Sequence, residues 1–280
     1  MKPRVRHILQ EWEQSQQRRE APPSLLFHEN SKLTRPGLDE LGRRIGRIMS
    51  EGLTKELARS WKCYPGHPQV ELPRANLVLE RGLQEVIVGR RSLRAFDPHR
   101  PVTLQELANL LQLSYGITGR LEDSGGTQYL RAIPSAGALY PLELYLMVQR
   151  VQGLDPGLYH YRVAHHALEA LELADQSESM QRMEREWGMG SAPAFYLVVS
   201  ALFARTMIKY RERGYRFILM EAGMLGQCAT LLAECQQLHS CMMGGWLDDE
   251  LNGLLGLDGS SESVVHVMCF GRAPREDAHG

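Results

Sequence analysis

The sequence predicts an α+β fold with a mixed or antiparallel central sheet flanked by helices. Three β-rich runs in the second half of the chain predict strands at residues 142–149, 194–200 and 263–271. Residues 216–238 are apolar on nearly all sides, which predicts a long buried helix. Because strands and helices do not alternate regularly along the chain, a doubly wound parallel sheet is not expected.

The composition is that of an ordinary globular enzyme, with 280 residues, 43% of them hydrophobic and 23% charged. The 32 basic and 33 acidic residues nearly cancel, which indicates neither a nucleic-acid partner nor a membrane surface. The charged N-terminus lacks a signal-peptide core, and no apolar run reaches the roughly 18 residues of a membrane span. Five scattered cysteines in no zinc-binding spacing indicate reduced thiols, so we expect a cytoplasmic protein without a metal site.

The N-terminal part of the chain is predicted to extend one core domain. We expect a helix at residues 1–20, irregular chain at 21–37, a second helix at 38–59 and extended or looped chain at 61–73. Apolar residues repeat at helical spacing in the first and third segments, while prolines interrupt the other two. We therefore place the extension at residues 1–75 and the core domain at residues 76–280.

The remaining elements of the core domain are read from local signals. A helical pattern after residue 76 ends near Gly89. Thr103 and Glu106 form a capping box, which predicts the start of a helix. Residues 158–162 alternate as a hairpin strand would, and Asp248 is expected to cap a further helix.

Candidate chemistry is concentrated in a few clusters. No G-x-G-x-x-G follows a strand and no Walker A sequence is present, so neither of these nucleotide-binding loops is predicted. The clusters that stand out are GRRSLRAFDP at 89–98, RAIPSAGALYPLELYLMV at 131–148, MIKYRERGYRFILMEAG at 207–223 and MMGGWLDDELNGLLGLD at 242–258.

The order and spacing of these clusters resemble the nitroreductase superfamily, and specifically its SagB-type branch of thiazole- and oxazole-forming dehydrogenases. FHENSK at 27–32 and the KCYP…ELP stretch also resemble that branch, so the match runs from about Phe27 to Arg272. The resemblance implies a nitroreductase-like fold and FMN bound by the domain 76–280. It also implies an interlocked homodimer with each flavin at the subunit interface.

The first cluster resembles the part of the family that holds the FMN phosphate. Arg90, Ser92 and Arg94 would grip the phosphate, because guanidinium groups bind it bidentately. Arg91 is included with them, and Arg272 resembles a late basic residue of the family that closes the same site. Taken on its residues alone, the cluster would be a solvated basic turn.

The second cluster and a later glycine pair resemble the parts that contact the flavin ring. Small side chains in the turn let backbone groups approach a flat ligand closely. The turn residues that would contact the isoalloxazine are Pro134, Ser135, Ala136, Gly137 and Ala138. Gly244 and Gly245 would direct a backbone N–H toward the flavin N5. Both segments could equally be plain turns, before a strand and before a helix.

Lys209–Tyr210 resembles the lysine–tyrosine pair that this branch places beside the flavin. Aromatisation of an azoline removes a proton and a hydride from adjacent ring carbons, and the proton requires a positioned base. We expect Lys209 to be the general base or proton relay and Tyr210 its partner, although the roles could be exchanged. The alternative is a surface Lys209 paired with Glu212 or Glu221, with Tyr210 simply packed.

A lysine is protonated at neutral pH unless its pKa, ordinarily about 10.4, is lowered. Burial or neighbouring cations would lower it. Three cations are close to the pair in sequence: Arg205, Arg211 and Arg213.

The resemblance implies an FMN-dependent oxidase that converts a peptidyl thiazoline or oxazoline to the thiazole or oxazole, with O2 reoxidising the flavin. A cyclodehydratase complex would deliver a ribosomal peptide, or a nonribosomal peptide synthetase would deliver a carrier-bound one, as for a stand-alone oxidase of a bacillamide-type pathway. One alternative is a general NAD(P)H-dependent nitroreductase or quinone reductase. Another is a flavin-stabilised scaffold subunit of a synthetase or cyclodehydratase complex.

Overall fold

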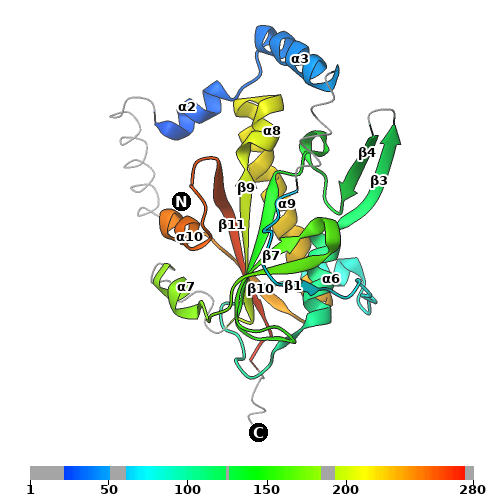
Figure 1. Ribbon diagram of the computed structural model, residues 1–280, viewed down its shortest axis with the longest axis vertical. Coiled ribbons are helices and arrows are strands. Elements are labelled where there is room, and N and C mark those ends of the chain that lie inside the picture. The colour runs from blue at the N-terminus through cyan, green and yellow to red at the C-terminus, as the bar shows by residue number, and fades with distance from the viewer. Residues whose placement is uncertain (1–21, 51–60, 124–125, 184–192, 275–280) are drawn as a thin grey trace, which may run out of the picture.

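The computed structural model describes residues 22–50, 61–123, 126–183 and 193–274, which are arranged around a central sheet (Figure 1). The strands of this sheet are β1 (Gln69–Glu71), β5 (Leu142–Val148), β7 (Gly157–Arg162), β8 (Ala167–Glu172), β9 (Phe195–Leu202), β10 (His239–Met243) and β11 (Glu262–Gly271). Their order is β1-β8-β7-β5-β9-β11-β10, and every neighbouring pair is antiparallel. The predicted α+β fold with an antiparallel sheet is confirmed, as are the four predicted strands.

Two smaller pieces of sheet complete the strands. β2 (Val102–Thr103) pairs in parallel with β6 (Val151–Gln152). β3 (Ile117–Asp123) and β4 (Gly126–Arg131) form a hairpin that projects from the domain in Figure 1. Because its two strands mix polar and apolar residues without a clear alternation, this hairpin was not predicted from the sequence.

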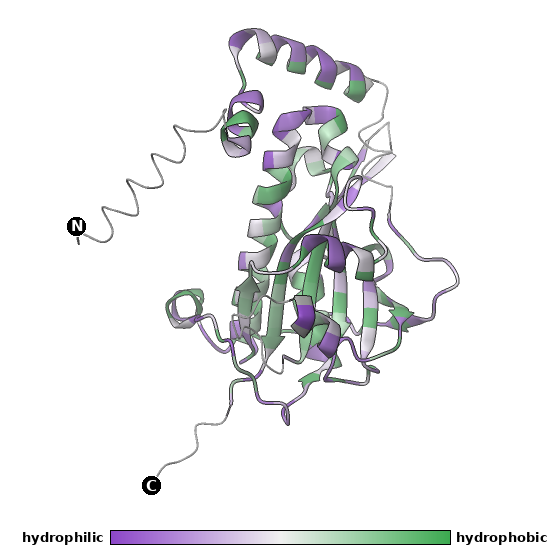
Figure 2. Ribbon diagram, turned by 90° about the vertical axis from the view of Figure 1, so that its left-hand side faces the viewer, coloured by the Kyte–Doolittle hydropathy of each residue, from purple (hydrophilic) through white to green (hydrophobic). Residues whose placement is uncertain are grey.

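Apolar cores lie on both faces of the sheet. Alternate side chains of a strand point to opposite faces, and in β5 Leu144 and Leu146 join one core while Tyr145 and Met147 join the other. The first core is covered by α6 (Leu104–Tyr115) and α9 (Glu212–Cys235), and the second by α10 (Asp248–Leu254) and α7 (Ser177–Met183). Figure 2 shows the apolar strands between more hydrophilic outer helices.

The local helix signals are confirmed at α6 and α5 (Leu83–Gly89). At the start of α6, the Glu106 N–H donates to the Thr103 hydroxyl at 3.2 Å and the Thr103 N–H donates to the Glu106 carboxylate at 2.8 Å. α5 ends at Gly89, as predicted. Asp248 is not the cap of α10, because Leu247 holds that position and Asp248 lies in the first turn. There its carboxylate favours the positive end of the helix and accepts a hydrogen bond from Trp246.

The long apolar segment forms α9, at 212–235 rather than 216–238. By length and composition it is the one helix in the described ranges that matches a membrane span, yet half of its most apolar stretch is buried inside the fold. That burial is typical of a core helix.

The N-terminal prediction is wrong in one segment. Residues 22–37 are not irregular throughout. α2 (Pro23–Asn30) begins on Pro23, where the missing N–H costs nothing, and α3 (Arg35–Ser50) already begins at Arg35, so only the short connection 31–34 is irregular. The predicted helix 1–20 and residues 51–59 of the second helix lie outside the described residues. Residues 61–68 form a loop with a turn at 65–67 that leads into β1, as expected for an extended or looped segment.

Candidate active site

Lys209 and Tyr210 lie at the end of α8 (Phe203–Tyr210) and face the loop 134–138. Gly137 in that loop has φ of 66°. A Cβ atom at Gly137 would lie 2.8 Å from both the Lys209 Nζ and the Tyr210 hydroxyl oxygen. Only glycine combines this backbone conformation with so close an approach. The structure therefore brings the predicted ring-contact loop and the predicted catalytic pair together at one point.

Burial controls the protonation of the pair. Lys209 is only 6% exposed, and its removal from water lowers the pKa of its ammonium group. The same effect raises the pKa of Tyr210, so its hydroxyl stays protonated. The Lys209 Nζ lies 5.3 Å from the centroid of the Tyr210 ring. Burial thus favours loss of a proton from Lys209 and keeps the Tyr210 hydroxyl a hydrogen-bond donor.

The neighbouring arginines do not cause the lowered pKa of Lys209. The guanidinium of Arg205 pairs with Glu143 at 2.5 Å, and that of Arg211 pairs with Glu40 at 2.6 Å. Arg213 donates to the backbone carbonyl of Ser31 at 3.3 Å. Desolvation alone accounts for the direction of the shift.

A buried polar cluster holds the loop from behind. The Glu221 side chain is 1% exposed and accepts a hydrogen bond from the Tyr115 hydroxyl at 3.0 Å. Burial raises the pKa of Glu221 to about 7, while hydrogen bonds from Ser135 and Tyr115 lower it. Ser135 also accepts from the Tyr140 N–H at 2.9 Å. Glu221 is therefore a partner of the loop and not a surface partner of Lys209.

Arg131 completes this cluster, and sequence reasoning missed it. Its guanidinium lies 4.4 Å from the Tyr115 ring centroid and 4.8 Å from that of Tyr140. Its backbone N–H donates to the Tyr140 hydroxyl at 2.9 Å. Tyr140 itself has a positive φ of 47°, a strained conformation that these contacts maintain. The one available signal was the position of Arg131 at the start of the second cluster.

The arginine cluster runs alongside β10, the edge strand of the sheet. Ser92 forms a parallel bridge with Ser240, and the Leu93 N–H donates to the Ser240 carbonyl at 3.0 Å. Arg90 is half-buried, while the side chains of Arg91, Ser92 and Arg94 are exposed. Arg91 differs from the others because its Nη1 donates to the carbonyls of Val88 and Arg90, both at 2.8 Å.

Arg94 also lies close to β10. A hydrogen bond with Cys269 and the positive charge of Arg94 together lower the pKa of Cys241 to about 7. Since Cys241 is on β10 and next to Ser240, the Arg94 guanidinium lies near the same stretch of the edge strand.

Gly244 and Gly245 follow the other end of β10. A Cβ atom at either glycine would meet nothing within 4 Å, so their backbone is open to a ligand. Met242, between the glycines and the arginines, is 38% exposed. At about 3.3 Å per residue, Ser240 to Gly244 covers about 13 Å. The exposed arginine cluster thus lies at one end of β10 and the open glycine backbone at the other, while Ser240, Cys241 and Met243 between them are buried. We call this edge, from the arginine cluster to Gly245, the β10 strip.

Arg272 follows β11 and lies at the basic end of the strip, since Gly271 pairs with His239 at the start of β10. Its guanidinium is already engaged: Nη2 donates to the Glu106 carboxylate at 2.6 Å and Nε to the Pro101 carbonyl at 3.4 Å. The structure thus brings Arg272 to the arginine cluster but directs its side chain toward the start of α6.

The two halves of the predicted site lie at opposite ends of the central strands. α8, which carries Lys209, continues directly from β9, whose last residue Leu202 pairs with Glu262 at the start of β11. Arg272 follows the other end of β11, a strand of ten residues that is about 30 Å long. Figure 1 shows α8 at the top and the last strand ending near the bottom. Within one chain, the predicted catalytic pair Lys209–Tyr210 and the arginine cluster therefore do not meet.

Comparison with known proteins identifies relatives over most of the chain. The model of the nitroreductase family matches residues 87–272. The nitroreductase-like protein MJ1384 of Methanocaldococcus jannaschii is 32% identical over 207 residues, covering 73% of this chain and 96% of that protein.

Two further relatives are peptide-processing proteins. The microcin B17-processing protein McbC of Escherichia coli is 32% identical over 150 residues, covering 50% of this chain and 54% of McbC. The trifolitoxin-processing protein TfxB of Rhizobium leguminosarum is 34% identical over 154 residues, covering 52% of this chain and 41% of TfxB. The match spans about half the length of these two relatives.

Solved structures share the fold. A nitroreductase-like protein of Anabaena variabilis superposes with a TM-score of 0.63 at 25% identity, covering 75% of this chain and 42% of that chain. A chain of the E. coli microcin synthetase McbBCD complex, solved with truncated pro-MccB17 bound, superposes with a TM-score of 0.57 at 21% identity, covering 87% of this chain and 99% of that chain. A nitroreductase-like protein of Exiguobacterium sibiricum in complex with FMN superposes with a TM-score of 0.50 at 12% identity, covering 71% of this chain and 92% of that chain.

The family match covers the arginine cluster, the loop around Gly137, the pair Lys209–Tyr210 and the glycine pair. These relatives include two peptide-processing proteins and a nitroreductase-like protein. This chain belongs to the nitroreductase family of oxidoreductases and is a homologue of the peptide-processing members McbC and TfxB.

Proposed function

We propose that this protein is an FMN-dependent azoline oxidase, which converts a thiazoline or oxazoline in a peptide to the thiazole or oxazole. The observation that carries the proposal is the buried amine of Lys209, held with the Tyr210 hydroxyl against Gly137. Removal of a ring proton needs such a base, whereas nitro or quinone reduction by NAD(P)H does not. The homology to McbC and TfxB supports the same choice.

The chemistry assigns each side chain a separate task. Lys209, with its lowered pKa, accepts the proton from one ring carbon of the azoline. FMN, when bound, supplies the acceptor for the hydride that leaves the adjacent carbon. Tyr210 remains protonated and donates a hydrogen bond that orients the substrate beside Gly137. Lys209 then releases its proton to solvent, which restores the neutral amine.

The β10 strip is the proposed FMN site. Arg90, Ser92 and Arg94 would hold the phosphate, with Arg272 at its edge if it exchanges Glu106 for the anion. Arg91 would add positive charge, although part of its guanidinium is engaged by backbone carbonyls. The open backbone at Gly244–Gly245 would lie against the ring. The other side of the ring would be covered by the loop of Pro134, Ser135, Ala136, Gly137 and Ala138.

The separation of the two halves supports a homodimer. One FMN molecule does not bridge the length of β11, about 30 Å, so we propose that each site combines the β10 strip of one subunit with the loop and Lys209–Tyr210 of its partner. Exposed apolar side chains on α5 and α9 suit such an interface. They are Leu83, Ile87, Val88, Leu219, Met220 and Met224.

A further proposal concerns delivery of the substrate. The microcin synthetase chain of similar fold was solved in the McbBCD complex with a truncated precursor peptide. By analogy, we propose that a cyclodehydratase complex or a peptide synthetase brings the azoline-bearing peptide to this protein. The proposed division into an extension, residues 1–75, and an FMN-binding domain, residues 76–280, would leave both halves of the site on the domain.

The test uses FMN-loaded protein and a synthetic peptidyl thiazoline under air, without nicotinamide. Thiazole formation with oxygen consumption, lost in Lys209→Ala, is the expected result. Protein that is inert toward the thiazoline but consumes NAD(P)H with a nitroarene or quinone would contradict the proposal and establish the reductase alternative. If the protein is instead a scaffold, a partner synthetase should stay active with the Lys209→Ala/Tyr210→Ala double variant. The same synthetase should lose activity when FMN is removed from this protein.

A further inference from the structure

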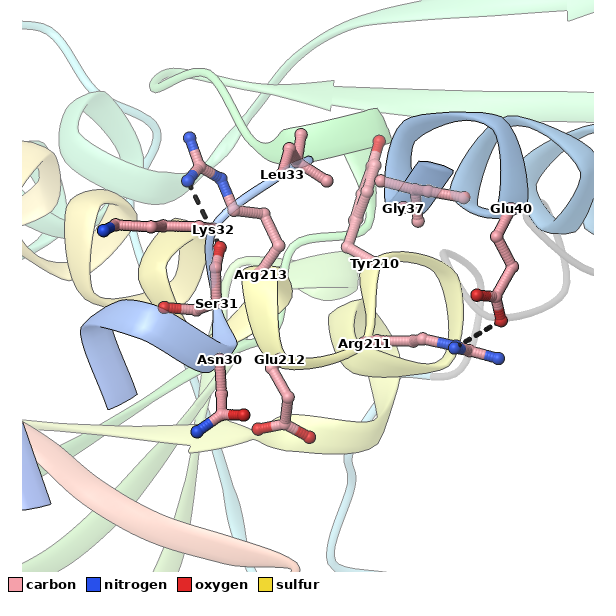
Figure 3. Close-up of a pocket in the computed structure, with 11 residues that line it drawn as sticks. Asn30, Ser31, Lys32, Leu33, Gly37, Glu40, Tyr210, Arg211, Glu212 and Arg213 are labelled. Carbon is pink, nitrogen blue, oxygen red and sulfur yellow. Dashed lines mark hydrogen bonds and ion pairs between the residues drawn. The ribbon is translucent and has the colours of Figure 1, made fainter. Parts of the chain in front are cut away.

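A pocket of about 220 Å³ opens beside Tyr210, between the N-terminal helices and the junction of α8 with α9 (Figure 3). Leu33, on the connection between α2 and α3, forms one wall, and Glu40 on α3 forms another. Tyr210 and Arg213 form the wall that belongs to the junction. The pocket is thus built jointly by the N-terminal extension and the segment that carries the catalytic pair.

The extension is fixed to the junction by several polar contacts. Arg216 donates to the His28 carbonyl at 2.6 Å and to the Ser31 hydroxyl at 2.7 Å. Arg213 donates to the Ser31 carbonyl, and the rings of Phe27 and Tyr215 pack edge to face with centroids 5.4 Å apart. These contacts hold the connection between α2 and α3 over α9, so its wall of the pocket is ordered.

A strained residue shapes the other wall. Arg211, between α8 and α9, has φ of 51° and ψ of −141°, a region that residues with a Cβ rarely occupy. Its N–H donates to the Met207 carbonyl at 2.7 Å, and its guanidinium pairs with Glu40 on α3 at 2.6 Å. The sharp bend leaves the Tyr210 ring on the pocket wall while the Tyr210 hydroxyl reaches Gly137. One side chain therefore connects the pocket with the proposed reaction site.

The lining selects a type of ligand. Leu33 is 44% exposed and, with the Tyr210 ring, offers an apolar surface. Arg213 makes one hydrogen bond to a carbonyl and, among the described residues, no ion pair with a carboxylate. Figure 3 shows Arg213 and Tyr210 on the same side of the junction, with Leu33 between them. The volume is below the roughly 300–1,000 Å³ of pockets for whole small molecules, which indicates a subsite for part of a longer ligand.

We propose that this pocket binds the peptide segment that flanks the azoline, with an aliphatic side chain against Leu33 and the Tyr210 ring and a backbone carbonyl facing the Arg213 guanidinium. The inference rests on the proposed function, since it extends the substrate away from Lys209. The N-terminal extension would then select which peptide sequence surrounds the azoline ring.

The test compares two leucines of the extension with nearly equal exposure. Leu33→Trp fills the pocket, whereas Leu25→Trp changes a residue that is 45% exposed on α2 and does not line it. Both variants are prepared with FMN bound and assayed with a peptide that has leucine on both sides of a thiazoline, and with a thiazoline that carries no flanking residues. Binding of a fluorescein-labelled peptide with an internal thiazole is measured separately by anisotropy.

We expect Leu33→Trp to lower the ratio of kcat/KM for the flanked over the unflanked substrate about tenfold, the effect of roughly one lost apolar contact. It should weaken peptide binding by a similar factor, while Leu25→Trp changes neither. An unchanged ratio and unchanged binding in Leu33→Trp would overturn the inference. If the wild type oxidises neither thiazoline, the proposed function fails. In that case the anisotropy measurement still tests the inference. Equal affinity of the wild type and Leu33→Trp for the labelled peptide, or no binding by the wild type, would refute it.

Discussion

The Lys209 side chain approaches Gly137 so closely that a methyl group on this glycine would come within 2.8 Å of Nζ. The relationship joins two segments that are more than seventy residues apart in sequence. It also explains why the loop needs glycine at this position, since both φ and the available space exclude a side chain.

Gly137→Ala should therefore displace Lys209 and Tyr210 without unfolding the protein. We expect a loss of stability of about 1–3 kcal/mol, from strain at positive φ, together with a large loss of thiazoline oxidation. Gly46→Ala in α3 is the matched control, because its Cβ would meet nothing within 4 Å. This control should keep full activity and gain up to about 1 kcal/mol in urea unfolding. Full activity in Gly137→Ala would show that the contact is dispensable.

Lys209→Arg should abolish oxidation although it preserves the positive charge. A guanidinium stays protonated at all accessible pH values, so it cannot accept the ring proton. We expect turnover to fall by about 10²–10⁴-fold, with the flavin spectrum unchanged. In the wild type, kcat/KM should rise with pH as Lys209 loses its proton. The inflection should lie below the value of an ordinary lysine, because burial lowers its pKa. A flat pH profile would argue against Lys209 as the base.

Glu221→Gln should change how stability depends on pH. The pKa of Glu221 is raised to about 7 in the folded protein, so the folded state holds this proton more tightly than the unfolded chain. Stability is therefore lost as pH rises from about 4.5 to 7, by roughly 3 kcal/mol. Glutamine carries no charge and can still accept from Tyr115, so this loss should disappear in urea unfolding at pH 5 and pH 8. Glu122→Gln, an exposed carboxylate, serves as the control and should behave as the wild type.

Arg94→Ala should weaken FMN binding more than Arg91→Ala does. Charge-assisted hydrogen bonds contribute about 1.5–3 kcal/mol, which corresponds to a rise in Kd of roughly ten- to a hundredfold. Arg91 should matter less, because its Nη1 is engaged by two backbone carbonyls. Flavin fluorescence titration measures both values. Equal losses would show that Arg91 turns toward the phosphate in the flavin-bound protein.

The sequence predicted the features that depend on local signals. The capping box at Thr103, the central apolar helix and the buried strands each have a pattern within one short window. α2 was missed because paired prolines suggested irregular chain although Pro23 suits the first position of a helix. β10 was missed because five residues carry too little periodicity to identify a strand.

The candidate site was predicted by residue but not by arrangement. Nothing near Arg131 in sequence indicates that its guanidinium lies against Tyr115, or that Glu221 supports Ser135. Such contacts follow from the order of the strands, which a single sequence does not reveal. For the same reason, the separation of Lys209 from Arg272 became visible only in the sheet topology.

That separation has a genetic consequence. In the proposed dimer, a Lys209→Ala subunit still offers its partner an intact β10 strip, and an Arg94→Ala subunit still offers an intact Lys209. At an FMN concentration too low to fill the Arg94→Ala strip, the two variants should therefore complement each other when co-expressed, restoring about a quarter of the wild-type sites under random pairing. A double variant carrying both changes in one chain should complement neither itself nor either parent. A locus that encodes this protein would then show intragenic complementation, with alleles falling into two groups according to which end of β11 they affect.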